Sequence, residues 1–364
     1  MNVGIYTITQ GQNYGNRLQN YAVQTILEEN NMKAKTLQYK RWDNDGNFLV
    51  KLSIKKWLHD MHIRRDLIAK RMWVFNRFNK KYVHFEKKFL KINGNNDSIV
   101  DKYDCFVTGS DQVWNLDKKS ITFNIPFLGF AGSKKRVSIS ASFGFDSIDD
   151  NKIKEKFKKY LNEMDAISVR EESGKKIAEQ LTDKEINVLI DPTLMLSEDK
   201  WKIISKKPHK FNKEKYIFVY LLGKYSEDVI QKIRAYAQRK KLEVVMLEND
   251  DRRLKISNDE EYAYGPSEFV WLLSHSDKVI TDSFHGAVFS LIHKKEFNII
   301  PRNGDSCDMS TRITYLGELF QIQNMMSEDL KFEKSANVDY GFFNRKLKEE
   351  QDKFRKYLLD NLTL

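Results

Sequence analysis

The chain has 364 residues and a mass of 43.0 kDa, about twice the length of a typical domain, which predicts two domains with separate cores. Hydrophobic residues make up 41% and charged residues 31%, with only 16 Gly and 5 Pro, which excludes a collagen-like or mostly disordered protein. The formal net charge is +11, from 62 basic and 51 acidic residues.

Hydrophobic patterning predicts strands that alternate with helices along the whole chain. In the first half, strands are expected at residues 3–9, 35–39, 105–108, 136–142, 166–169 and 186–190, and helices at 18–27, 152–163 and 171–180. In the second half, strands are expected at 216–222, 243–247, 278–281 and 297–300, and helices at 226–240, 266–275, 286–293 and 344–361. Such alternation implies parallel sheets covered on both faces.

These elements predict an α/β fold with two Rossmann-like domains and a cleft between them. The first domain is expected over residues 1–196 and the second over 197–340, with a lysine-rich link at 197–215 and a C-terminal helix over 341–364. Ligands of such sheets bind at the carboxyl ends of the strands. Candidate functional residues are therefore sought where strands end.

The basic residues concentrate in one segment. Residues 51–91 hold 13 Lys and Arg against 3 Asp and Glu, so +10 of the net charge lies there. Apolar side chains recur in it at helical spacing, which predicts a basic helical hairpin. We expect this hairpin to bind an anionic membrane surface or a lipid-diphosphate-linked acceptor, or else to pack its aromatics on the domain and solvate its lysines. Charge this localised does not indicate a nucleic-acid partner.

The chain offers little material for disulfides, metals or membrane spans. Cys105 and Cys307 are its only cysteines, too few for a disulfide framework or a zinc site. Neither a run of about 18 apolar residues nor a signal peptide is visible. We expect a cytoplasmic protein, peripheral at the inner face of the membrane if the hairpin binds lipid, that uses no metal.

The clearest chemical motif is ITDSFHG at residues 280–286, where an apolar strand ends and a helix begins at once. Backbone N–H groups and the helix dipole favour an anion there, so Ser283 and Gly286 are candidate donor-binding residues. A bound anion would raise the pKa of His285 toward that of a useful general acid. The alternative is a histidine that only caps the helix.

Two further loops follow strands of the first domain. In TGSDQVWN, residues 108–115, Asp111 could orient or deprotonate a hydroxyl and Trp114 could stack on a sugar ring, although a cap and a core tryptophan are equally compatible. In NYGNRLQN, residues 13–20, Asn16 and Arg17 could hold a sugar or an anion. This loop is not the GxGxxG fingerprint of a dinucleotide site.

Two arginines follow strands that border the expected cleft. Arg170 precedes a helix in SVREESG, and Arg302 follows the last strand of the second domain. Two guanidinium groups suit a ligand with both a phosphate and a carboxylate, because each can bind an oxyanion with two hydrogen bonds. Either arginine could instead pair with a nearby acid such as Glu171.

Five motifs in this order, NYGNRLQNYA, VTGSDQVWN, SVREESG, IDPTLML and TDSFHGAVFS, resemble the polysaccharide pyruvyl transferase family over most of residues 1–320. The basic hairpin has no counterpart in that pattern. The resemblance implies a two-lobed fold similar to GT-B glycosyltransferases. It also implies transfer of a pyruvyl group from phosphoenolpyruvate, a co-substrate, onto two sugar hydroxyls as a cyclic ketal, with no cofactor.

On this interpretation His285 protonates the methylene carbon of phosphoenolpyruvate, and Arg170 and Arg302 hold its anionic groups. Asp111, Trp114, Asn16 and Arg17 position the sugar acceptor, which is expected in a cell-surface polysaccharide or its lipid-linked precursor. Two alternatives remain open from the sequence: a glycosyltransferase that uses a nucleotide sugar, and a non-catalytic carbohydrate-binding scaffold.

Overall fold

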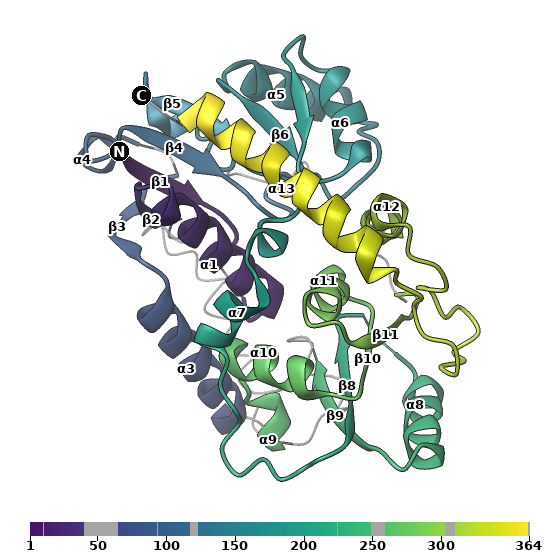
Figure 1. Ribbon diagram of the computed structural model, residues 1–364. Coiled ribbons are helices and arrows are strands. Elements are labelled where there is room, and N and C mark those ends of the chain that lie inside the picture. Colours follow the sequence, from purple (N-terminus) through teal and green to yellow (C-terminus); the bar gives the residue numbers. More distant parts are fainter. Residues whose placement is uncertain are drawn as a thin grey trace.

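The computed structural model describes residues 1–9, 11–39, 65–92, 94–116, 123–223, 225–248, 259–302 and 310–362. Two lobes, each built on a parallel sheet, lie next to each other in these ranges (Figure 1). The predicted α/β class with two Rossmann-like domains is confirmed. The predicted boundary after residue 196 falls in the connection between the two sheets.

The first lobe contains most of the predicted elements at nearly the predicted positions. It comprises β1 (Asn2–Tyr6), α1 (Tyr14–Glu29), β2 (Lys33–Tyr39), α3 (Arg65–Tyr82), β3 (Phe85–Leu90), α4 (Asp97–Val100), β4 (Cys105–Thr108), η1 (Gly129–Ala131), β5 (Lys135–Ser138), α5 (Asn151–Asn162), β6 (Ile167–Val169), α6 (Glu172–Glu179), β7 (Ile186–Val188) and η2 (Pro192–Met195).

The first sheet has the strand order β3-β2-β1-β4-β5, and neighbouring strands are parallel. Isolated bridges from Val137 to Ala166 and from Ala141 to Val169 continue it to β6 and β7. This order is that of the Rossmann fold, in which ligands bind where the strand order reverses, here beside β1 and β4. The crevice of this lobe therefore lies at the carboxyl ends of these two strands.

The second lobe follows the same plan with a smaller sheet. It comprises α7 (Glu198–Ile204), β8 (Tyr216–Leu221), α8 (Glu227–Arg239), β9 (Glu243–Glu248), α9 (Asp259–Tyr262), α10 (Pro266–His275), β10 (Lys278–Thr281), α11 (Phe284–Ile292), β11 (Glu296–Ile299), α12 (Ser310–Phe320) and α13 (Tyr340–Leu362). The strand order is β11-β10-β8-β9, again parallel. All six residues of β8 are buried, as expected for a strand covered on both faces.

The prediction of a helical hairpin over 51–91 is only partly correct. Residues 51–64 lie outside the described ranges, and α3 is helical, but residues 85–90 form the strand β3 instead of a helix. Phe85 pairs with Thr36 and Leu90 with Tyr39, so β3 completes the edge of the first sheet. Sheet pairing with β2 overrides the loose helical period of these aromatic residues.

The stretch predicted as a link, 197–215, also contains a helix. The Ser197 hydroxyl caps α7 by accepting a hydrogen bond from the Lys200 N–H. Trp201 on this helix is fully buried, and its ring contacts Phe289 of α11 at a centroid distance of 4.7 Å. The lysine-rich stretch predicted as a link therefore contains a short amphipathic helix that packs on the second lobe.

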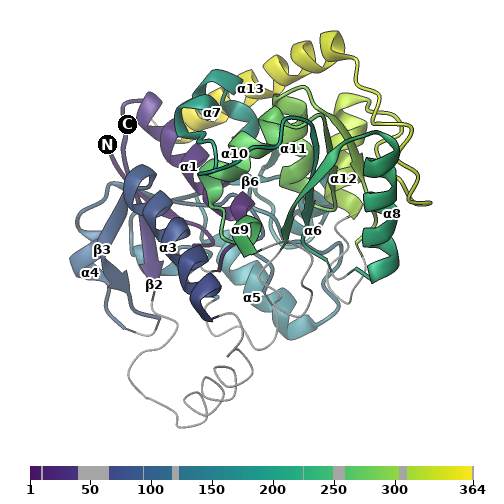
Figure 2. The ribbon, with the colours of Figure 1, turned by 90° about the horizontal axis from the view of Figure 1, so that it is seen from below.

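Two helices hold the lobes together. The last helix, α13, follows the second lobe and crosses back over the first (Figure 1), where Tyr357 donates a hydrogen bond to the Ser138 carbonyl. In the other direction, α3 leaves the first lobe and lies beside α9 and α10 (Figures 1 and 2).

Arg71 fixes the position of α3 between the lobes. Its side chain is fully buried and donates hydrogen bonds to the carbonyls of Gln12, Glu248 and Tyr262 at 3.0 to 3.2 Å. Its guanidinium carbon also lies 5.2 Å from the Tyr14 ring centroid. One side chain thus connects α1, α3 and the second lobe.

We predict that Arg71→Met lowers the free energy of unfolding by about 3 kcal/mol, because three carbonyls lose a charged donor that methionine cannot replace. Urea denaturation followed by circular dichroism measures the loss. Arg77→Met is the matched control on the exposed face of α3 and should change the stability by less than about 0.5 kcal/mol. Equal stability of the two variants would contradict this role of Arg71.

Candidate active site

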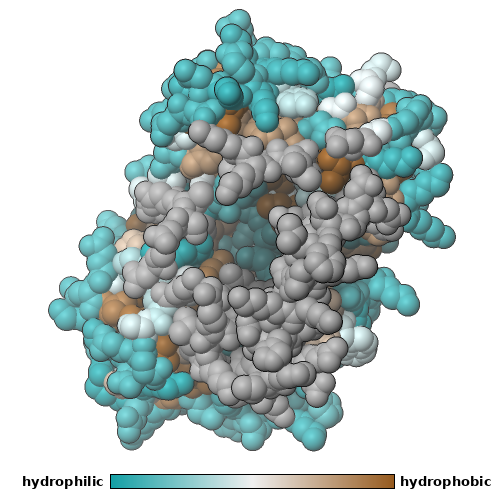
Figure 3. Space-filling model, turned by 180° about the vertical axis from the view of Figure 1, so that it is seen from behind, coloured by the Kyte–Doolittle hydropathy of each residue, from teal (hydrophilic) through white to brown (hydrophobic). Residues whose placement is uncertain are grey.

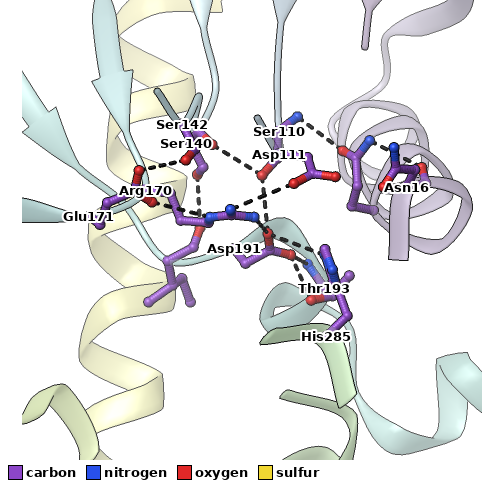
Figure 4. A network of polar contacts seen from close by, with 12 residues as sticks. Asn16, Ser110, Asp111, Ser140, Ser142, Arg170, Glu171, Asp191, Thr193 and His285 are labelled. Atoms are coloured by element: carbon purple, nitrogen blue, oxygen red, sulfur yellow. Dashed lines mark hydrogen bonds and ion pairs between the residues drawn. The ribbon is translucent and has the colours of Figure 1, made fainter. Parts of the chain in front are cut away.

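Polar side chains from the ends of successive strands converge in the first lobe (Figure 4). Ser110 and Asp111 follow β4, Ser140 and Ser142 follow β5, Arg170 and Glu171 follow β6, and Asp191 follows β7. Because the strands are parallel, their carboxyl ends meet at one edge of the sheet, and residues distant in sequence become neighbours. Figure 3 shows the hollow between the lobes, with hydrophilic residues at its floor.

An ion pair between Arg170 and Asp191 forms the centre of this cluster. The Arg170 Nη1 lies 2.9 Å from the Asp191 Oδ2, and both side chains are almost completely buried. Ser110 donates to the same oxygen at 3.1 Å. Thr193 donates its backbone N–H and its hydroxyl to the other oxygen, Oδ1, at 3.0 and 2.7 Å. The Asp191 carboxylate therefore has its lone pairs satisfied inside the protein.

Arg170 also contacts two other carboxylates. Its Nη2 lies 3.6 Å from the Asp111 Oδ1, and its Nε lies 3.4 Å from the Glu171 Oε2. The pairing with Glu171 that the sequence left open is thus present. Burial alone would lower the pKa of Arg170, but Glu171, Asp191 and Asp111 raise it, so this guanidinium stays charged. The Arg170 guanidinium carbon also lies 4.5 Å from the ring centroid of Phe284 on α11.

His285 brings the second lobe to this cluster. It lies in the first turn of α11, is 6% exposed, and places its Nε2 3.7 Å from the Asp191 Oδ2 (Figure 4). The N-terminus of α1 packs directly against the ring, so a Cβ at Gly15 would lie only 2.2 Å from the His285 Nδ1. A glycine is therefore required at position 15 for the two lobes to approach at the histidine.

The protonation states in this pair follow from burial and charge. Burial opposes ionisation of Asp191, yet His285 and Arg170 beside it and the hydrogen bonds from Thr193 lower its pKa to about 2. Burial lowers the pKa of His285, and the carboxylates of Asp191 and Asp111 compensate only in part. His285 is therefore neutral near pH 7 in the unliganded protein.

A third arginine lies close to this cluster and was not identified from the sequence. Arg312 on α12 is 3% exposed, and burial together with the positive charge of Arg170 lowers its pKa to about 10. A small pocket is lined by both arginines together with Phe284 and Tyr315. Ile313, Leu316 and Phe320 recur at helical spacing, and this pattern could have predicted α12.

The other predicted donor-binding residues have structural partners. The Arg302 Nε donates to the Asp282 Oδ2 at 3.1 Å, and its side chain is 21% exposed. The Ser283 hydroxyl accepts from the Gly286 N–H at 3.4 Å and caps α11. A Cβ at Gly286 would lie 2.3 Å from the Thr281 Oγ1, so this glycine allows α11 to pack closely on β10.

Asn16 and Arg17 lie in the first turn of α1, which is capped by the side chain of Asn13. The Arg17 Nη2 donates to the Gly11 carbonyl at 2.6 Å, while its Nε and Nη1 have no hydrogen-bond partner among the described residues. Burial lowers the pKa of Arg17 to about 10. Asn16 is 9% exposed at the same helix start, next to the Gly15 contact.

Trp114 does not occupy the position that its predicted role requires. Its indole is completely buried, stacks on Phe127 at a centroid distance of 4.9 Å, and donates to the Pro126 carbonyl at 3.3 Å. A sugar ring has no access to either face of this indole. The core interpretation of Trp114 that the sequence left open fits these contacts.

The described residues contain no group of three or more His, Cys, Asp or Glu side chains arranged to hold a metal ion. Among the described helices, none is both long and apolar enough to cross a bilayer.

We predict that Asp191→Asn lowers the pKa of His285 further, because the variant removes a carboxylate that stabilises the imidazolium. An NMR titration of the histidine side chains measures this shift. Glu198→Gln is the matched control, since Glu198 lies 3.7 Å from His293 and should affect the pKa of that histidine alone. An unchanged His285 titration in Asp191→Asn would show that the two groups are not coupled.

Comparisons with known proteins identify the fold and the family of the chain. Among solved structures, it is similar to UDP-GlcNAc 2-epimerase from Methanocaldococcus jannaschii in complex with UDP-GlcNAc and UDP, with 14% identity, a TM-score of 0.53, and coverage of 98% of this chain and 100% of that one. A second structure of the enzyme from that organism gives 13% identity, a TM-score of 0.52, and coverage of 97% and 92%.

A putative UDP-N-acetylglucosamine 2-epimerase from Listeria monocytogenes gives 10% identity, a TM-score of 0.51, and coverage of 97% and 90%. At this identity the likeness shows the fold alone, and that fold is the two-lobed GT-B arrangement.

No curated protein matches the chain. The family model described as polysaccharide pyruvyl transferase matches residues 13–304, which include every candidate residue above except Arg312. The chain therefore belongs to the polysaccharide pyruvyl transferase family.

Proposed function

We propose that this protein transfers the pyruvyl group of phosphoenolpyruvate onto two hydroxyls of a sugar and forms a cyclic ketal. The observation that carries the proposal is the position of His285. A buried, neutral imidazole lies 3.7 Å from the carboxylate of the Asp191–Arg170 pair, where the two lobes meet. Membership of the family makes a transferase of this kind the first expectation.

The arginines are assigned different roles because their partners differ. Arg170 already contacts three carboxylates, so we assign it to positioning Asp191 and to the local electrostatic field. Arg302, which is partly exposed, and Arg312 are assigned to the phosphate and the carboxylate of the donor. The N-terminus of α11 adds a favourable dipole for these anionic groups.

The chemistry assigned to His285 is a proton transfer. The protonated imidazole donates its proton to the methylene carbon of phosphoenolpyruvate, and positive charge develops at the adjacent carbon. A sugar hydroxyl attacks that carbon and loses its proton, for which the nearby Asp111 carboxylate is the assigned acceptor. The carbon–oxygen bond to phosphate then breaks and releases phosphate. The second hydroxyl adds to the same carbon, and the released phosphate takes up the proton that this hydroxyl loses.

The acceptor is assigned to the α1 side of the cleft, where Asn16 and Arg17 lie in the first turn of the helix. We propose a sugar of a cell-surface polysaccharide or of its lipid-linked precursor, made on the cytoplasmic side of the membrane. The basic charge of segment 51–91 supports a partner that carries phosphate or an anionic lipid surface.

We predict that His285→Gln lowers the rate of phosphoenolpyruvate consumption by about 10²- to 10⁴-fold, because the proton donor is lost. The release of inorganic phosphate, measured with a panel of sugar acceptors, follows the reaction. His293→Gln is the matched control, since it removes another buried histidine associated with α11 that lies outside the site. Comparable turnover in wild type and His285→Gln would refute the assigned mechanism.

The same assay separates the two alternatives. A glycosyltransferase would consume a nucleotide sugar and leave phosphoenolpyruvate intact, and a non-catalytic scaffold would bind the acceptor and consume neither donor.

We further predict that phosphoenolpyruvate binding takes up protons near pH 7. His285 is neutral in the free protein because burial lowers its pKa, and the negative donor must raise that pKa before the imidazole can act as an acid. Calorimetric titrations in buffers with different ionisation enthalpies measure the uptake, which should approach one proton per donor and disappear in His285→Gln. Donor binding without proton uptake in the wild type would exclude His285 as the acid.

A further inference from the structure

A second, basic site lies on the side of the molecule where α3 approaches the second lobe. A groove of about 600 Å³ runs between α3 and the start of α10, and its far wall is the loop at residues 206–210. The Lys206 N–H donates to the Ser267 carbonyl at 3.1 Å, which ties this loop to α10. We call this feature the α3–α10 groove.

The rim of the α3–α10 groove is strongly positive. Five exposed cations line it, and they come from two segments distant in sequence: Lys70, Arg77, Lys81, Lys206 and Lys210. The one carboxylate among the lining residues, Glu268, lies 3.8 Å from Lys206 and accepts a hydrogen bond from the Gly265 N–H. No described carboxylate pairs with any of the other four cations, so the groove attracts anions.

One exposed aromatic side chain lies among these cations. Trp73 lines the groove and is 57% exposed, and the Arg77 guanidinium carbon lies 5.3 Å from its ring centroid. Phe78, another aromatic residue of α3, is buried, so the aromatics of this helix divide between core and solvent. An exposed tryptophan among lysines and an arginine is typical of a surface that enters the head-group region of a membrane.

We propose that the α3–α10 groove docks the protein on an anionic phospholipid surface. The cations bind lipid phosphates, and Trp73 enters the head-group region. A soluble phosphorylated ligand would be bound by the basic rim alone and would give no role to the exposed indole of Trp73. The attraction per basic residue near such a surface is about fivefold in affinity, and it is screened over about 8 Å at physiological salt.

Docking at the groove would bring the candidate active site close to the membrane. Tyr264, which lines the groove, accepts a hydrogen bond through its carbonyl from the Tyr14 hydroxyl at 2.9 Å. Tyr14 precedes Gly15, which contacts His285. This placement suits a lipid-linked acceptor and in that respect rests on the proposed function, whereas the docking itself does not depend on it.

Sedimentation with vesicles tests the docking without any substrate. Wild-type protein should bind vesicles of phosphatidylcholine with phosphatidylglycerol, bind poorly to phosphatidylcholine alone, and lose affinity between low and physiological salt. The double variant Lys206→Glu, Lys210→Glu should bind the acidic vesicles at least tenfold more weakly. Trp73→Ser, which keeps the charge, should weaken binding several-fold.

A control variant separates the groove from overall charge. Lys152→Glu, Lys158→Glu makes the same change in net charge on exposed positions of α5 and should bind acidic vesicles like the wild type. Equal losses in the two double variants, or equal binding to neutral and acidic vesicles, would overturn the proposal.

Displacement from vesicles by millimolar glycerol phosphate would identify a soluble ligand instead. Vesicle binding without phosphoenolpyruvate turnover would refute the proposed function and leave the docking intact.

Discussion

The ion pair between Asp191 and Arg170 is the interaction on which the site depends. Two buried charges are costly unless each is paired and hydrogen-bonded, and here Ser110 and Thr193 satisfy the remaining lone pairs of the carboxylate. The pair therefore fixes the loops after β4, β6 and β7 relative to one another. His285 therefore lies next to a carboxylate whose position and charge are set by residues of the first lobe.

The lobes must be held closely for this meeting to occur, because His285 comes from the second lobe and its neighbours from the first. α13 crosses from the second lobe onto the first, and α3 crosses in the opposite direction and is fixed by Arg71. Gly15 allows the backbone of α1 to reach the imidazole. The closeness of the lobes at the site is thus set by contacts outside it as well as within it.

The sequence was sufficient to predict the parallel α/β architecture, because buried strands such as β4 and β8 are continuous apolar runs between helical segments. It also located most strand ends, where the site lies. It could not reveal that Trp114 is core or that Arg170 is already paired, since both facts depend on contacts between distant segments. Residues 85–90 were mistaken for helix because their pairing with β2 is a tertiary effect.

On the proposed mechanism, the charges of the site connect donor binding to proton transfer. Arg170 and Arg312 face the carboxylates of Asp111, Glu171 and Asp191, so this cluster alone carries no positive excess while His285 is neutral. On the proposed mechanism an anionic donor is held more strongly once the imidazole gains a proton, and the nearby anion in turn favours that proton. On the proposed mechanism the acid is thus generated by the substrate it must protonate, and in the empty site burial keeps it neutral.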